Sequence, residues 1–153
     1  MAREIARILE ADIDEIYDEQ NRKGVVDGWL IAGRDATLEK EASIKFNKNP
    51  REYDLVVVGT PIWAFTLTPS IRSYLMANKG KFKKLAFFST SAGAGIKRTF
   101  EEMEKLSHKP VATLALKSKA WSVRLHLDED NNMKKISNFC DEIKKQLLHE
   151  AKK

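Results

Sequence analysis

The most constraining feature of the sequence is an unbroken apolar run that stops at a glycine. Leu55-Val56-Val57-Val58 holds three consecutive valines, and Gly59-Thr60-Pro61-Ile62-Trp63 follows at once. An apolar run without polar alternation is typical of a parallel strand that helices cover on both faces. In an open α/β sheet the ligand crevice lies beyond the carboxyl ends of the strands, so residues 60–65 form the first candidate site.

A second stretch of the chain has the same organisation. Leu85-Ala86-Phe87-Phe88 is apolar, and it is followed by Ser89-Thr90-Ser91-Ala92-Gly93-Ala94-Gly95. The first loop offers flat aromatic surface, and the second offers backbone N–H groups that small residues leave accessible. We expect the two loops to share one cleft and to hold a planar polar ring.

The segments YDLVVVGTPIWAFTLTPSIRSYL and KLAFFSTSAGAG together resemble the flavodoxin family of FMN proteins. The resemblance implies that the two loops hold the isoalloxazine ring of FMN, with Trp63 packed on a ring face. It also implies electron transfer or flavin-dependent reduction, with a small quinone or a redox protein as the partner. The implied cofactor-binding residues are Thr60, Pro61, Ile62, Trp63, Ala64, Phe65, Ser89, Thr90, Ser91, Ala92, Gly93, Ala94 and Gly95.

The N-terminal part of the sequence departs from this family. Flavodoxin-like chains begin with an apolar strand and a Ser/Thr-rich phosphate loop, whereas residues 1–9 already read as the first helix. We therefore expect an N-terminally truncated domain that lacks the first strand. Three outcomes stay open: direct pairing of segments 11–17 and 55–58, completion by another chain, or an imperfect fold.

The absent phosphate loop also bears on the cofactor. Losing several charge-assisted hydrogen bonds, at about 1.5–3 kcal/mol each, predicts weak or absent FMN binding. The alternative function is therefore an FMN-free flavodoxin-like scaffold or interaction module.

The remaining pattern predicts strands that alternate with helices. Strands are expected at 11–17, 55–58, 85–88 and 111–116, and residues 117–130 are read as a further short strand or an ordered loop. Helices are expected at 2–10, 25–42, from Pro69 to about Asn78, at 97–107 and at 131–150. This order predicts one α/β domain over residues 1–153, a three-layer flavodoxin-like parallel sheet with helices on both faces.

Composition excludes several other classes of protein. The chain has 27 Lys and Arg against 22 Asp and Glu, a net charge of +5, but we find no nucleic-acid motif. No apolar run reaches the roughly 18 residues of a membrane span, and the single cysteine fits a reducing, cytoplasmic setting. The three histidines suggest no metal site, and neither a P-loop nor a nucleophile elbow occurs. A homo-oligomer stays open.

Overall fold

The computed structural model describes residues 1–19, 42–91, 93–119, 126–127 and 129–150. Residues 25–41 of the expected helix at 25–42 lie outside this part of the chain, and Ala42 is not helical. The described elements are, in order, α1 (Ala2–Leu9), β1 (Tyr17–Asp18), β2 (Ile44–Lys45), a 3-10 turn (Pro50–Glu52), β3 (Val56–Pro61), α3 (Pro69–Ala77), β4 (Leu85–Ser91), α4 (Ile96–Leu106), β5 (Ala112–Lys119), β6 (His126–Leu127) and α5 (Glu129–Glu150).

The main sheet has the order β3-β4-β5-β6 among the described strands. The pairs β3–β4 and β4–β5 are parallel, and β6 pairs antiparallel with the end of β5. The two apolar runs that the sequence analysis singled out are thus neighbouring parallel strands, as expected. The short strand β6 lies within the segment 117–130, whose middle residues are outside the described part.

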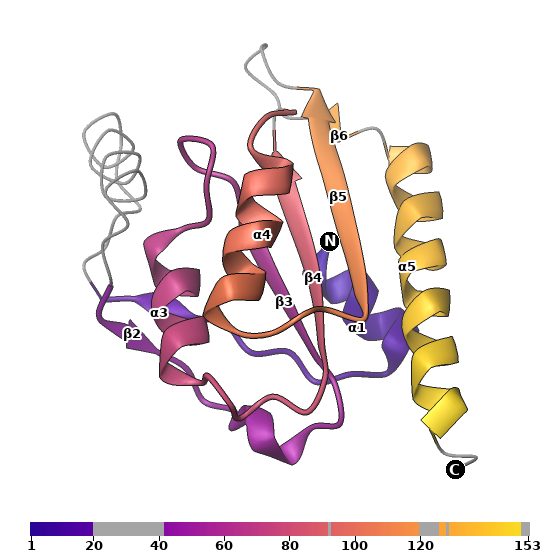
Figure 1. The fold of residues 1–153 in the computed structure, drawn as a ribbon. Helices are drawn as coiled ribbons and strands as arrows, with labels where there is room; N and C mark the ends of the chain where they lie inside the picture. The colour runs from indigo at the N-terminus through magenta and orange to yellow at the C-terminus, as the bar shows by residue number, and fades with distance from the viewer. Residues whose placement is uncertain (20–41, 92, 120–125, 128, 151–153) are drawn as a thin grey trace.

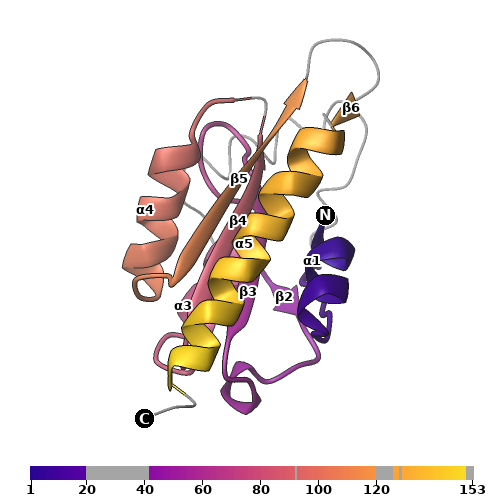
Figure 2. The same ribbon diagram turned by 90° about the vertical axis from the view of Figure 1, so that its right-hand side faces the viewer.

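Helices cover both faces of this sheet (Figure 1). One face carries α3 and α4, whose Leu75 and Met103 pack with Val58 and Phe87. The other face carries α1 and α5, which lie side by side in both views (Figure 2) and share a core that includes Ile5, Ile136, Phe139, Ala86 and Leu114. Burial on both faces explains why the valine run has no polar alternation. The fold class is therefore the predicted α/β sandwich.

Segment 11–17 does not form the expected parallel strand. Residues 11–16 have no strand structure, and β1 is a two-residue strand that pairs antiparallel with β2. The physical reason is a tertiary contact of Asp14, whose carboxylate accepts hydrogen bonds from the backbone N–H groups of Asn47 (2.8 Å) and Lys48 (2.7 Å). Direct pairing of segments 11–17 and 55–58, one of the three outcomes considered, therefore does not occur in the structure.

Helix α3 begins where the sequence predicts it. Thr68 is the N-cap residue and Pro69 is the first helical residue, a position at which proline has no hydrogen bond to lose. The helix runs away from the candidate site and ends before the buried Asn78, whose side chain donates to the carbonyl of Tyr74 (2.9 Å). No helix in the described ranges combines the length and the apolar character needed to cross a membrane.

Candidate functional site

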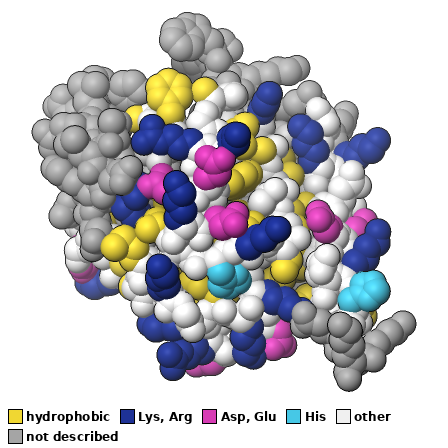
Figure 3. All heavy atoms as spheres, viewed as in Figure 1, with side chains coloured by type: hydrophobic (Ala, Val, Ile, Leu, Met, Phe, Trp, Pro, Cys, Tyr) yellow, Lys and Arg dark blue, Asp and Glu magenta, His cyan; other side chains and the backbone are white. Residues whose placement is uncertain are grey.

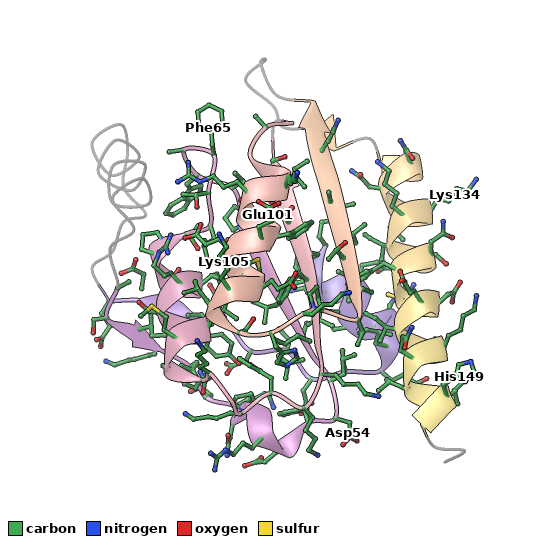
Figure 4. All side chains as sticks on the ribbon, viewed as in Figure 1. Asp54, Phe65, Glu101, Lys105, Lys134 and His149 are labelled. Atoms are coloured by element: carbon green, nitrogen blue, oxygen red, sulfur yellow. The ribbon has the colours of Figure 1, made fainter. Side chains whose placement is uncertain are left out.

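The two candidate segments lie side by side at the carboxyl edge of the sheet. Parallel pairing continues past the apolar runs, so that Thr60 is opposite Ser89 and Pro61 is opposite Thr90. The strands are thus longer than the sequence indicated, and Thr60, Pro61 and the predicted loop residues 89–91 belong to them. Figure 4 labels Phe65 at one end of the molecule and Asp54, which precedes β3, at the other.

Two contacts join the loops that follow these strands. The Ile62 N–H donates to the Thr90 carbonyl at 2.9 Å. Gly95 lies against the backbone of Phe65 so closely that a Cβ atom added to it would be 2.6 Å from the Phe65 Cα and carbonyl oxygen. Only glycine permits this approach of two backbones. Two loops on opposite sides of the molecule could not form one site. In the structure the two loops are in direct contact.

The first loop is a tight turn, which we call the Trp63 turn (Trp63–Thr66). Trp63 and Thr66 exchange backbone hydrogen bonds at 2.9 and 3.0 Å, and the two residues between them have positive φ angles, 47° at Ala64 and 67° at Phe65. Positive φ at both central residues is typical of a type I′ turn, which usually contains Asn-Gly. An L-residue in this conformation costs about 1–2 kcal/mol. The turn is strained, and it places Phe65 63% exposed at its tip.

The second loop, which we call the glycine loop (residues 93–95), leads into α4. Gly93 has φ 118° and Gly95 has φ 81°, values that other residues rarely adopt. Gly93 and Ala94 are exposed, and the Gly93 N–H donates to the Ser91 hydroxyl at 3.1 Å. Ala92 lies outside the described residues. The loop therefore presents backbone without large side chains beside the Trp63 turn.

The predicted site residues differ in what they can offer to a ligand. Ile62 and Trp63 are half-buried, and Pro61, Ala64 and Phe65 are exposed. In contrast, the side chains of Thr60 and Ser89 are buried on the α3–α4 side of the sheet. The Thr60 hydroxyl donates to the Pro61 carbonyl at 2.8 Å. The accessible part of the site is aromatic surface and backbone together with the half-buried Thr90, and none of its side chains titrates in the ordinary pH range.

A buried polar cluster that was not predicted from the sequence lies beneath the Trp63 turn. The Thr66 hydroxyl donates to Glu102 of α4, and the Glu102 carboxylate also pairs with Arg72 of α3. The Arg72 and Glu102 side chains are only 5% and 14% exposed. One signal could have revealed the cluster: Arg72 directly follows Ile71 on the buried side of α3, where a cation needs a partner.

The surface around these elements is mixed in charge. In the view of Figure 3, lysine and arginine side chains are spread over the visible face with acidic side chains between them, and they form no single stripe. Among the described residues there is no group of three His, Cys, Asp or Glu side chains that could hold a metal ion.

The geometry defines an α/β protein in which two loops meet at the carboxyl ends of neighbouring parallel strands. A family model described as Flavodoxin matches residues 1–119. The chain belongs to the flavodoxin family.

Solved structures share this fold at low sequence identity. A flavoprotein from Lactobacillus acidophilus, crystallised in complex with FMN, is similar with a TM-score of 0.61 and 18% identity over 74% of this chain and 83% of that one. A candidate flavoprotein from Bacteroides eggerthii gives a TM-score of 0.60 and 17% identity over 90% of this chain and 87% of that one. A search of the curated proteins found no significant match.

Proposed function

We propose that the chain binds the isoalloxazine ring of FMN against the surface formed jointly by the Trp63 turn and the glycine loop, and that it serves electron transfer or flavin-dependent reduction. The close approach of Gly95 to the Phe65 backbone carries the proposal, because it joins the two loops into one site. Family membership and the FMN-bound structure of the Lactobacillus acidophilus flavoprotein support it.

The chemistry of the loops fits a flavin ring. The half-buried Trp63 supplies an aromatic face, and the exposed backbone of the glycine loop supplies donors and acceptors for the polar edge of the ring. Phe65 stands at the rim, where it can shield the ring from water. Bound FMN would supply the redox chemistry, while the protein positions the ring and tunes its surroundings.

The described part of this chain offers few groups at the start of α1 that could bind the phosphate of FMN. The first turn of α1 contains Ala2, Arg3 and Glu4, none of which has a hydroxyl group, and Glu4 carries a negative charge. A helix N-terminus that binds phosphate usually combines free N–H groups with hydroxyl donors. We therefore propose that the ring provides most of the affinity of the 153-residue chain for FMN.

Fluorescence titration with two flavins tests both parts of this proposal. FMN and riboflavin, which lacks the phosphate, are added separately to the purified chain, and quenching of flavin fluorescence is followed. We expect both to bind, with dissociation constants within about tenfold of each other. A folded chain that binds neither flavin contradicts the proposed function, and FMN binding more than a hundredfold tighter than riboflavin contradicts the dominance of the ring.

A pair of variants at Trp63 locates the binding. Stacking of a heterocycle on an aromatic side chain contributes about 1–3 kcal/mol, so Trp63→Ala should weaken flavin binding by roughly 5-fold to 150-fold. Trp63→Phe keeps an aromatic face and serves as the matched control, with most of the affinity retained. Equal affinities of the Ala variant and the unmodified chain would place the ring elsewhere.

The cellular setting and the partner belong to the same proposal. We propose a cytoplasmic protein that exchanges electrons with a small quinone or a redox protein. The free, buried Cys140 agrees with a reducing compartment.

One observation favours a second candidate function, an FMN-free interaction module. Val56 and Ile62 both direct their N–H groups toward β4, so the N–H groups of Val57 and Gly59 point to the opposite edge of β3. No described strand pairs with that edge. Self-association in light scattering by a chain that binds no flavin would favour this function, and a flavin-binding monomer would contradict it.

A further inference from the structure

The Trp63 turn needs support from outside itself. Its two central residues, Ala64 and Phe65, both have positive φ angles, and neither is the asparagine or glycine that such a turn prefers. A backbone conformation of this kind persists only when surrounding contacts determine it. The two hydrogen bonds between Trp63 and Thr66 close the turn, but they do not attach it to the rest of the protein.

Thr66 makes that attachment. Its side chain is fully buried, and its hydroxyl donates to one oxygen of the Glu102 carboxylate. The other carboxylate oxygen pairs with the Arg72 guanidinium. The turn is therefore fastened to both helices of this face, through Glu102 to α4 and through Arg72 to α3.

Helix α4 contacts the same turn a second time at its N-terminal end. Gly95, the N-cap residue of α4, packs against the backbone of Phe65. Glu102 lies two turns further along the helix and holds Thr66. Two anchor points on one helix restrict both translation and rotation of the turn.

Stability alone does not account for a buried ion pair at this place. Removing two charges from water is unfavourable, and well-packed apolar side chains often replace such a pair without loss of stability. An ion pair does, however, give a hydrogen-bond acceptor a defined direction, because the guanidinium orients the carboxylate. The Arg72–Glu102 pair thus has the properties of a positioning device for the Thr66 hydroxyl.

We propose that Glu102, oriented by Arg72, is a positioning residue that holds the Trp63 turn in its strained, ring-binding conformation through Thr66. The inference rests on the proposed function for its consequence, since a turn held in advance binds a flavin ring with less loss of freedom. Without the anchor, the turn relaxes toward ordinary φ angles, and the aromatic face of Trp63 no longer has a fixed orientation.

Thr66→Val and Thr66→Ser form the decisive pair of variants. Valine keeps the shape of threonine and removes the hydroxyl, whereas serine keeps the hydroxyl and removes a methyl group. The first measurement needs no flavin: hydrogen exchange of the Thr66 amide, which bonds to the Trp63 carbonyl, is compared with that of core amides in β4. We expect exchange at residue 66 to become at least tenfold faster in the Val variant, with β4 less affected, and to return toward the original rate in the Ser variant.

The second measurement is riboflavin affinity in the same proteins. We expect at least a tenfold loss in the Val variant and recovery in the Ser variant. The inference is wrong if Thr66→Val and Thr66→Ser lose global stability equally and the exchange rate of the residue-66 amide changes by the same factor as that of the β4 amides. The cluster would then only join α3 to α4. If the unmodified chain binds no flavin, the proposed function fails, while the exchange rates still decide whether Thr66 holds the turn.

A third variant covers the case in which Thr66→Val does not fold. Glu102→Gln keeps a hydrogen-bond acceptor for Thr66 and removes the charge that orients the side chain toward Arg72. We expect faster exchange at residue 66 and weaker riboflavin binding in a folded protein. An unchanged exchange rate in this variant would contradict the positioning role of Glu102.

Discussion

Substitution of Gly95 by alanine tests the contact on which the site depends. The new Cβ would lie 2.6 Å from the Cα and the carbonyl oxygen of Phe65 and 2.7 Å from its carbonyl carbon. These are backbone atoms, so no side-chain rotation relieves the overlap. Alanine at the φ of 81° also costs about 1–2 kcal/mol, and overpacking of a fixed contact adds about 1–3 kcal/mol. We expect a total loss of about 2–5 kcal/mol.

Gly80→Ala is the matched control for this experiment. Gly80 has nearly the same φ, 77°, but nothing lies within 4 Å of its added Cβ, and it follows α3 at the end of the molecule away from the site. Its substitution should therefore cost only the conformational part, about 1–2 kcal/mol. Urea unfolding followed by circular dichroism measures both losses.

The difference between the two glycine variants isolates the clash. Gly95→Ala should lose about 1–3 kcal/mol more than Gly80→Ala. It should also weaken flavin binding, which Gly80→Ala should leave unchanged. Equal losses of stability, within about 0.5 kcal/mol, would refute the close approach of the two loops and with it the shared site.

Three further predictions concern the scaffold. An added Cβ at Gly59 would lie 2.0 Å from the Phe88 ring, so Gly59→Ala should destabilise the protein. In a double-mutant cycle of unfolding free energies, Phe88→Leu should recover part of this loss. Strictly additive effects of the two substitutions would contradict the contact. Although burial opposes ionisation, hydrogen bonds from Lys48 and Asn47 hold the pKa of Asp14 below its ordinary value. The stabilising contribution of Asp14 is therefore present above its unfolded pKa and is lost as pH falls through the folded one. Asp14→Asn should remove this loss of stability at acid pH. Identical pH profiles of the unfolding free energy in the variant and the unmodified chain would contradict the role of Asp14. Burial, with a smaller effect of the Asp14 charge, raises the pKa of Tyr74 from 10.0 to about 12. The stabilising contribution of Tyr74 should therefore be full below pH 10 and disappear as pH rises through 12. In a spectrophotometric titration, the unmodified chain should show a late ionisation step that the Tyr74→Phe variant lacks.

The strands could be predicted because their apolar runs are buried on both faces. The runs that begin at Leu55 and Leu85 became β3 and β4, and their adjacency followed from the parallel α/β pattern. The ends were harder to predict, because Thr60 and Ser89 look like loop residues while the structure buries them in paired strands. Polarity alone does not distinguish a buried hydroxyl in a strand from an exposed one in a loop.

Contacts between residues far apart in the chain account for the remaining misses. Segment 11–17 was expected to be a strand, but Asp14 instead bonds to backbone amides more than 30 residues away. The cluster beneath the Trp63 turn escaped notice for the same reason, since Thr66 and Glu102 are 36 residues apart. The sequence indicated which ends of the two strands carry the candidate loops but not where the loops begin, and their use by a flavin stays a prediction.

The unusual composition of the Trp63 turn also matters for protein engineering. A library screened only for thermal resistance would favour Asn-Gly at positions 64 and 65, since those residues relax the backbone there. Such a choice would delete the aromatic group that projects from the tip of this turn. Stabilising this molecule by consensus turn chemistry would therefore remove its exposed aromatic side chain from the proposed site.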